Sequence, residues 1–448
     1  MKSVLQHQIQ AYIQTENLFC ADNHLLVALS GGADSVALLR VLLELGYSCA
    51  AAHCNFHLRG EESNRDEVFC QTLCKELNIE LHVTHFDTTT YAQEKGVSIE
   101  MAARELRYEW FENLCCTYGY TRVAVAHHRD DSVETLLLNL IRGTGLAGLT
   151  GIRPLNGRVV RPLLCITRQE ILAYLKTLGQ EFVTDSTNLQ DEYVRNKIRL
   201  QIIPQLEKIN PQVGEKLFET IRHLREVETI YRNFIEEAIQ RVTDDTQQII
   251  HIPSLLAEVE PRAVLFEILR NRGFVSAQID EIFRSITAES GKCFTNKKWQ
   301  ILKDRDTLLI RPNRVEEKRR ISIPHAPSEI LLSNASVLKI KRLPHTPEYS
   351  IPRTPDVATL DAAQVEFPLT IRPWERGDKF APFGMKGRKK LVSDLLTDLK
   401  LTLFEKEAQL VMTDAHDRIL WVLGLRTDER AKVTEETKEI IEIKIKKL

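Results

Sequence analysis

The stretch LLVALSGGADS, residues 25–35, decides the fold, because it joins an apolar run to two glycines and then to a polar helix start. The LLVAL run is typical of a buried strand, and the VALLRVLLEL that follows the turn has the apolar spacing of a helix. Gly31 and Gly32 let the backbone turn tightly and approach a ligand. The unpaired N–H groups of the helix point back into the turn, so the stretch predicts a phosphate-binding site.

This turn differs from the GxxxxGK[ST] loop that handles a γ-phosphate, because no lysine occurs between Ser30 and Leu45. It resembles instead the SGGxDS loop of the N-type ATP pyrophosphatases, which bind ATP, release pyrophosphate and leave AMP on an oxygen of the substrate. The resemblance implies that ATP is held by Ser30, Gly31, Gly32, Ala33, Asp34 and Ser35, and that Asp34 recruits Mg²⁺. A Gly-Gly turn capped by Asp and Ser is the alternative, but the flanking strand and helix favour the nucleotide.

Apolar runs alternate with helical patterns over the first third of the chain. The runs cover residues 25–29, 48–54, 80–86 and 122–127, and the helical patterns end at residue 45 or cover 64–77, 99–116 and 132–142. This alternation predicts the α/β class, with a doubly wound parallel sheet. Ligands of such sheets bind beyond the carboxyl ends of the strands, where the loops with Ser30, His53 and His127 would meet.

The rest of the chain predicts two further domains. We expect boundaries that give a first domain at 1–212, a small helical domain at 213–315 and a mixed α+β domain at 316–448. A capping box at Thr167 and Glu170 starts one helix, and basic residues mark another over 193–205. A long helix is expected over 211–240, two more over 261–286, and a hairpin that turns at 304–306.

The composition is that of a globular cytoplasmic protein: 448 residues, 43% hydrophobic, with a formal net charge of −2. No uncharged apolar run approaches the roughly 18 residues that a membrane helix needs, and the first 20 residues favour an amphipathic helix over a signal peptide. Nine cysteines without a CxxC pair predict reduced thiols, with no zinc site and no disulfide framework. Binding to nucleic acid would therefore depend on local basic patches.

The richest cluster of titratable groups is AHHRDDSVET, residues 126–135. Asp131 and Glu134 lie three residues apart at a helix start and project to the same side. Capping explains one of them, but the preceding His-His-Arg-Asp-Asp predicts a site for a cation, a metal or an amine. The glycines of RGTGLAGLTG, residues 142–151, then predict a mobile loop over the crevice.

Two other segments carry weaker signals. Glu100, Arg104 and Arg107 form one stripe of a predicted helix, which an exposed salt-bridged face explains equally well. Near the C-terminus, aromatic residues alternate with basic ones, which favours an RNA surface over a solvated face. The residues concerned are Arg372, Trp374, Arg376, Lys379, Phe380, Phe383, Lys386, Arg388, Lys389 and Lys390.

Taken in order, these motifs resemble the tRNA(Ile)-lysidine synthetase family along the whole chain. The SGGADS loop is widely shared, whereas AHHRDDSVET, RGTGLAGLTGI and RGDKFAPFGMKGRKK are more specific. The resemblance implies a ligase that adenylates carbon 2 of the wobble cytidine in an isoleucine tRNA with a CAU anticodon. Free L-lysine then displaces AMP and forms lysidine. The first domain would be catalytic and the other two would bind tRNA.

The resemblance also implies roles for individual residues. Asp34, His127, Asp131, Glu134 and Arg107 would be catalytic, with Arg107 preferred to Arg104 as a lysine ligand. Substrate binding would involve Arg104, Arg107, Asp131, Glu134, Arg195, Asn196, Arg199, Lys389 and Lys390. The physical chemistry agrees, because an ammonium needs carboxylates and a carboxylate needs an arginine fork. One carboxylate or histidine could take the proton of the attacking amine.

One motif departs from the family pattern HxNHxLR. Residues 53–59 read HCNFHLR, so that Phe56 stands where the second histidine is expected and His57 follows one position later. We therefore keep His53 as a nucleotide contact and assign no role to His57.

Three alternatives remain open. A related enzyme that thiolates tRNA would need cysteines to carry sulfur, and an amidotransferase-type synthetase would lack the basic C-terminal domain. A non-catalytic RNA-binding protein would bind RNA without consuming ATP. The sequence leaves the oligomeric state open, and a homodimer is one option.

Overall fold

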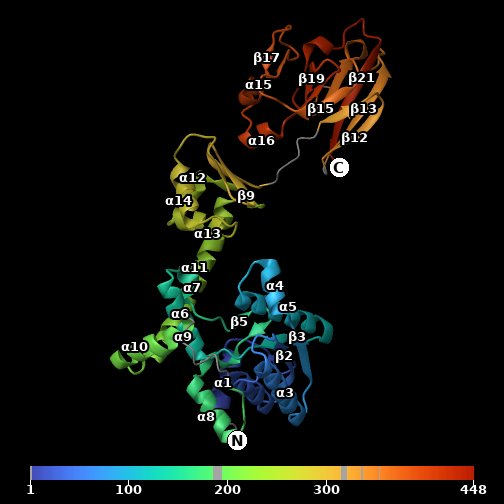
Figure 1. Cartoon of the computed structure of the whole chain (residues 1–448). Coiled ribbons are helices and arrows are strands. Elements are labelled where there is room, and N and C mark those ends of the chain that lie inside the picture. Colours follow the sequence, from blue (N-terminus) through green and yellow to red (C-terminus); the bar gives the residue numbers. More distant parts are fainter. Residues whose placement is uncertain (1–2, 185–193, 314–319, 334–335, 353, 448) are drawn as a thin grey trace. The chain divides into compact units, whose positions relative to one another are not determined.

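The computed structural model describes residues 3–184, 194–313, 320–333, 336–352 and 354–447 (Figure 1). It divides into two compact units, Met1–Asn233 and Phe234–Leu448. The DSTN run at 185–188, part of one family motif, lies outside the described residues.

The first unit contains a six-stranded sheet in the order β3-β2-β1-β4-β6-β5. The pairs from β3 to β6 are parallel, and β5 is antiparallel to β6. The strands are β1 (His24–Ala28), β2 (Ser48–Asn55), β3 (Leu81–His85), β4 (Arg122–Ala124), β5 (Leu155–Asn156) and β6 (Val159–Val160). The parallel part confirms the predicted sheet, whereas the β5–β6 hairpin was not predicted.

Helices cover both faces of this sheet. The helices up to residue 242 are α1 (Val4–Thr15), α2 (Ala33–Glu44), α3 (Glu61–Glu76), α4 (Thr88–Lys95), α5 (Ile99–Tyr118), α6 (Arg129–Ile141), α7 (Leu146–Leu149), α8 (Arg168–Leu178), α9 (Val194–Lys197), α10 (Ile203–Ile209) and α11 (Val213–Val242), with a 3₁₀ turn at Pro162–Cys165; α11 continues from the first unit into the second. On β1, Leu25 and Val27 are buried in one core with residues of α2, whereas Leu26 is buried in another with residues of α5. Because successive side chains of a strand point to opposite faces, this alternation confirms the doubly wound class.

The basic segment after residue 193 is not one helix, contrary to the sequence prediction. A π-helical segment, Ile198–Ile202, separates α9 from α10. Pro204 lies at the start of α10 and has no N–H to donate to the preceding turn, so the regular α pattern is interrupted there. The predicted capping box of Thr167 and Glu170 is present at α8.

The second unit begins with a four-stranded antiparallel sheet and three helices. The elements are β7 (Ile249–His251), β8 (Cys293–Thr295), β9 (Trp299–Asp304), β10 (Thr307–Pro312), α12 (Ile252–Leu256), α13 (Pro261–Arg270) and α14 (Ser276–Ser285). The hairpin predicted at 304–306 is the β9–β10 turn. β7 and β8 extend that hairpin at both edges, in the order β7-β10-β9-β8, so this region contains more strand than the sequence indicated.

The C-terminal part of this unit is the expected mixture of strands and helices. Its elements are β11 (Ile321–Ile323), β12 (Ser328–Ser333), β13 (Ser336–Pro344), β14 (Val357–Asp361), β15 (Leu369–Pro373), β16 (Lys379–Phe380), β17 (Lys390–Leu391), β18 (Leu410–Thr413), β19 (Ile419–Val422), β20 (Arg426–Thr427), β21 (Glu439–Lys447), α15 (Val392–Asp398) and α16 (Leu403–Ala408), with 3₁₀ turns at Ala362–Gln364 and Glu429–Ala431. Two sheets, β11-β15-β18-β19-β20 and β12-β13-β21-β14, contribute residues to one shared hydrophobic core.

Among the described residues, no helix combines the length and the apolar character that crossing a membrane would require.

Candidate active site

The SGGADS loop connects β1 to α2 and is held in place by its own serines. Ser35 donates its hydroxyl to the carbonyl of Gly32 at 2.9 Å, and the N–H of Ser30 donates to Ser35 Oγ at 3.2 Å. Gly31 has φ +86°, and the N–H of Val183 donates to its carbonyl at 2.9 Å. The loop is therefore fixed both from within and by the segment after α8.

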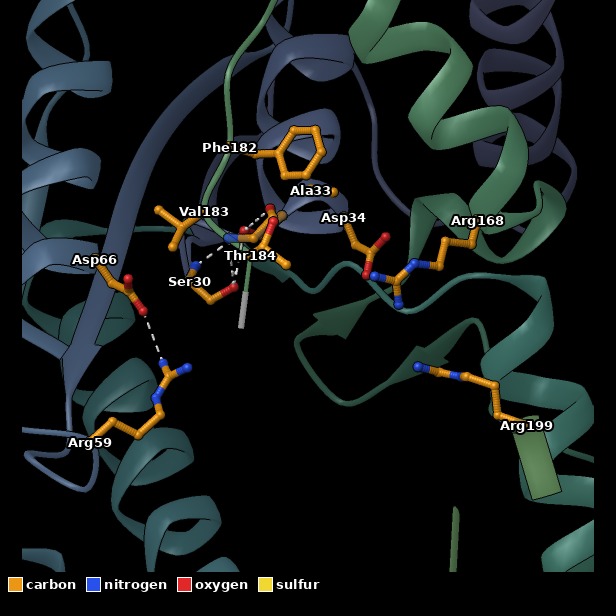
Figure 2. A pocket seen from close by; sticks show the side chains of 12 residues that line it. Ser30, Ala33, Asp34, Arg59, Asp66, Arg168, Phe182, Val183, Thr184 and Arg199 are labelled. Atoms are coloured by element: carbon orange, nitrogen blue, oxygen red, sulfur yellow. Dashed lines mark hydrogen bonds and ion pairs between the residues drawn. The ribbon is translucent and has the colours of Figure 1, made fainter. Parts of the chain in front are cut away.

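Two cavities open on this loop. The first measures about 360 Å³ and is lined by Ser30, Gly32, Ala33, Asp34, Ser35, Arg59, Asp66, Arg168, Phe182, Val183, Thr184 and Arg199. The second measures about 490 Å³ and shares Ser30, Asp34, Ser35, Arg59 and Asp66 with the first. Figure 2 shows the arginines of the first cavity on separate segments around the loop. The loop therefore borders a guanidinium-rich cavity that continues into a second one.

Asp34, in the first turn of α2, is one of two carboxylates that line both cavities, together with Asp66. Burial raises its pKa, while His128 and Arg168 oppose that shift. Its buried Oδ1 has no hydrogen-bond partner among the described residues. A carboxylate oxygen without a partner beside a phosphate-binding loop fits Mg²⁺, which takes one or two protein carboxylates together with phosphate oxygens. The described residues contain no cluster of three or more His, Cys, Asp or Glu side chains suited to a metal, so phosphates would have to complete the coordination.

His128 links Asp34 to the start of α6. Its ring is buried, and its Nε2 lies 3.9 Å from Asp34 Oδ2 and 3.5 Å from Asp131 Oδ2. The backbone N–H of His128 also donates to Asp131 Oδ2 at 2.9 Å. Burial alone would raise the pKa of Asp131, but His128 and Arg195 hold it below the ordinary value. His128 belongs to the AHHRDDSVET motif but was not among the predicted site residues. The feature that could have indicated it is the pair of adjacent histidines after the strand.

Glu134 is fully buried, and two arginines donate hydrogen bonds to its carboxylate oxygens. Arg195 Nε lies 2.9 Å from one carboxylate oxygen, and Arg199 Nε lies 2.6 Å from the other. The two arginines line the second and the first cavity respectively, whereas Glu134 lines neither. The structure thus brings these predicted residues together, with Glu134 behind the arginines. Asn196 lies between them on α9.

His127 faces the second cavity, with Arg161 behind it. Arg161 is buried and donates its Nε–H to His127 Nδ1 at 3.1 Å. Burial lowers the pKa of His127 to about 4, and Asp131 opposes the shift. Arg161 follows the unpredicted β5–β6 hairpin, and nothing in its sequence surroundings indicated this contact.

His53 and Arg107 complete the second cavity. His53 Nδ1 donates to the carbonyl of Leu29 at 2.9 Å, and burial lowers its pKa. The Arg107 guanidinium lies 5.1 Å from the ring centre of Phe56, which also lines the cavity. Arg104 instead lies over Tyr108, at 5.0 Å, and is not among the lining residues. Of the two arginines, Arg107 is the one placed to meet a ligand.

The departure at residues 53–59 has a structural counterpart. His57 has φ +52° and stacks on His85, with its Nε2 2.9 Å from His85 Nδ1. It is not among the residues that line the second cavity, and Phe56 is. The replacement of the expected histidine by Phe56 therefore accompanies the placement of His57 against another histidine.

The glycine-rich segment expected to cover the crevice contains α7 and lines neither cavity. Asn139 donates to the carbonyl of Gly148 at 2.7 Å, and Arg225 of α11 donates to that of Ile152 at 2.6 Å. A Cβ on Gly148 would lie 2.1 Å from Thr144 Oγ1, and one on Gly151 would lie 2.4 Å from Ser132 Oγ. Gly148 thus permits close packing within this segment, and Gly151 permits close packing on α6.

Lys389 and Lys390 lie in the second unit, after a turn rich in positive φ angles. Lys386, Gly384 and Gly387 all have φ above zero. Lys389 is exposed, and Phe383 nearby is 50% exposed. Lys390 is half-buried and ion-paired with Asp398. Lys389 is therefore the more available of the two predicted contacts.

Family models match three parts of the chain. A PP-loop domain matches residues 1–206, a TilS substrate binding domain matches 243–313, and a TilS substrate C-terminal domain matches 369–444.

Relatives match along nearly the whole chain. A tRNA(Ile)-lysidine synthase of Bacteroides thetaiotaomicron is 52% identical, over 99% of this chain and 100% of the relative. The one from Parabacteroides distasonis is 46% identical, over 97% and 98%. The one from Porphyromonas gingivalis strain W83 is 38% identical, over 97% of both chains.

Proposed function

Because this chain belongs to the tRNA(Ile)-lysidine synthase family, we propose that it uses ATP to join lysine to carbon 2 of the wobble cytidine of an isoleucine tRNA. The tRNA carries a CAU anticodon, and the reaction takes place in the cytoplasm. The observation that supports this most is the pair of cavities that meet at Ser30, Asp34 and Ser35. One cavity suits a polyphosphate, and the other suits an amino acid beside the base.

The first cavity would hold the phosphates of ATP. Its lining offers the serine hydroxyls and the helix N-terminus of the loop, with Arg59, Arg168 and Arg199 around them. In the adenylation step, the cytosine O2 attacks the α-phosphorus, the bond to the bridging oxygen breaks, and pyrophosphate leaves. The arginines would stabilise the charge that grows on pyrophosphate. Mg²⁺ held by Asp34 would supply further charge neutralisation of the phosphates.

The second cavity would hold lysine. Arg107 would bind its α-carboxylate and Asp131 would face an ammonium group. In the transfer step the neutral amine attacks carbon 2, and the bond from that carbon to O2 breaks. AMP leaves with the O2 atom, so one ATP and one lysine give lysidine, AMP and pyrophosphate.

Glu134, Arg195 and Arg199 would act together in this scheme. Because both arginines hydrogen-bond to Glu134, its carboxylate fixes the segment that carries them beside the loop. The guanidinium groups and Asn196 would then meet phosphates of ATP or tRNA. Glu134 would thus contribute to lysine binding indirectly, because it holds Arg195 and Arg199 in position.

The thiolation alternative is disfavoured because the thiol of the cysteine in the second cavity, Cys54, is protonated near neutral pH. Cys54 lines that cavity, but burial raises the pKa of its thiol to about 12. Sulfur transfer needs a thiolate near neutral pH. Cys54 therefore does not suit that chemistry.

The test is incorporation of labelled lysine into a tRNA(Ile) transcript with a CAU anticodon, followed by mass analysis of the nucleoside. We expect lysidine only when ATP is present, with equal amounts of AMP and pyrophosphate. A transcript with a UAU anticodon is the control and should remain unmodified. A sulfur-containing product, or tight RNA binding without ATP consumption, would refute the proposal.

A further inference from the structure

We infer that Arg161 fixes His127 in the tautomer that carries its proton on Nε2, so that His127 donates a hydrogen bond to an oxygen in the second cavity and does not act as a general base. This inference rests on the proposed function, because it assigns a role within the same site. It excludes His127 as the acceptor of the amine proton, a role that the sequence had left open between a carboxylate and a histidine.

The direction of the hydrogen bond settles the tautomer. An arginine side chain has only donors, so Nδ1 of His127 must accept at the 3.1 Å contact with Arg161 Nε. Arg161 is itself held, because its Nη1 donates to the carbonyl of Arg153 at 2.7 Å and its side chain is buried. A neutral imidazole that accepts at Nδ1 carries its proton on Nε2.

The surroundings keep this ring neutral. The charged groups that act on His127 are Asp131, Arg161, Arg195 and Arg104. Burial and the three arginines disfavour the imidazolium and outweigh Asp131, which favours it, so the pKa falls to about 4. At neutral pH the ring therefore has one nitrogen lone pair that could take up a proton, on Nδ1, and this lone pair accepts the hydrogen bond from Arg161. His127 has no free position that could take a proton from lysine.

A donor at Nε2 has a use in the transfer step. The oxygen on carbon 2 of the base first becomes bonded to phosphorus and then departs with AMP, and it gains negative charge as it departs. An N–H group fixed in advance stabilises such charge without reorganisation. His127 keeps its proton throughout, and the proton of the lysine ammonium passes to Asp131, which lines the same cavity. Arg161 is then a positioning residue for His127.

The tautomer can be observed without any activity measurement. In protein labelled with ¹⁵N-histidine, and assigned by comparison with His127→Gln, we expect pyridine-type Nδ1 and pyrrole-type Nε2 signals of His127 between about pH 6 and 8. Arg161→Met should mix the tautomers, and Arg161→Lys should preserve the native one. Arg158→Met removes an arginine from the same hairpin that pairs with Glu112, and should change nothing at His127. A proton on Nδ1, or an imidazolium, in the unmodified protein would overturn the inference.

A second experiment tests the chemical role. The amide of Gln can donate from the position of Nε2 but cannot take up a proton. If His127 is a donor, His127→Ala should slow the single-turnover release of AMP from adenylated tRNA by lysine about 100-fold, and His127→Gln should retain at least about ten times the rate of the Ala variant. Equal rates for the two variants would refute the donor role. If the unmodified protein formed no lysidine, the proposed function would be refuted, whereas the NMR result on the tautomer would still hold.

Discussion

Asp34 is half-buried, and folding raises the pKa of its carboxyl at a cost in stability. Its replacement by Asn separates stability from activity. A carboxyl whose pKa is raised on folding destabilises the folded state at pH values above its unfolded pKa, and this penalty fades as the pH falls through the folded pKa. At neutral pH, Asp34→Asn should therefore raise the melting temperature by about 2–4 °C, which corresponds to roughly 1 kcal/mol in a domain of this size. The gain should shrink toward pH 4 (approximately the unfolded pKa).

The same substitution should reduce adenylation by about 100-fold, because the carboxylate that would hold Mg²⁺ beside the phosphates is lost. Asp22→Asn, at an exposed position before β1, is the control and should alter neither quantity. Calorimetry across pH and single-turnover assays measure the two effects. A fall in melting temperature at neutral pH would contradict the burial argument, and unchanged adenylation would contradict the role of Asp34.

Gly31 and Gly46 form a matched pair of glycines. Their φ angles are +86° and +87°, but a Cβ on Gly31 would lie 3.4 Å from Cys70 Sγ, whereas one on Gly46 would have no neighbour within 4 Å. Each Gly→Ala change should lower the free energy of unfolding by about 1–2 kcal/mol. Only Gly31→Ala should also weaken ATP binding, because only Gly31 lies in the loop. Denaturant titration measures the stability of each variant, and a nucleotide-binding assay measures its ATP affinity. Equal ATP affinity in both variants would contradict the claim that the loop binds ATP.

At the scale of elements, Glu134 holds the segment α9 to α10 against α6. Glu134→Gln keeps the shape and removes the charge, so we expect a loss of about 1.5–3 kcal/mol in the free energy of unfolding. The matched control is Glu228→Gln, since Glu228 is also buried between two arginines, Arg153 and Arg232, away from the cavities. Both variants should lose stability, but only Glu134→Gln should lose lysine incorporation beyond what its stability explains. Similar losses of incorporation in both would reduce Glu134 to a general stabilising role.

The turn before β17 carries a separate prediction about tRNA. Lys389→Glu should weaken tRNA binding and reduce the slope of log affinity against log salt by about 1, as expected for one phosphate contact. Lys438→Glu, at another exposed lysine of the same unit, should have a smaller effect. Filter binding at several salt concentrations measures both slopes. Identical slopes in the two variants would place the RNA contact elsewhere.

For the whole molecule, the sequence predicted what depends on local patterns. The strand, glycine turn and helix around Ser30 are encoded within consecutive residues, and the capping box at Thr167 lies within one turn of helix. What it missed depends on chain segments that meet only after folding. Arg161 reaches His127 from 34 positions away, and Arg199 reaches Glu134 from 65. No residue pattern along the chain marks such pairs.

Local patterns also do not show where packing requires a small residue. Two of the four glycines at 143–151 are needed because side chains of Thr144 and Ser132 occupy the space of a Cβ. The sequence predicted that the carboxylates of Asp131 and Glu134 project to the same side, but spacing along a helix does not reveal that two distant arginines cover Glu134.

The central claim is that ATP bound at the SGGADS loop places AMP on the tRNA before lysine enters. The most direct measurement incubates the protein with the CAU transcript and ATP labelled at the α-phosphorus, without lysine, and then adds lysine. We predict that the label appears on the tRNA first and leaves as AMP when lysine is added, and that label at the γ-phosphorus never appears on the tRNA. Lysidine formed with no labelled tRNA at any time, or label on the tRNA that lysine does not release, would contradict the account.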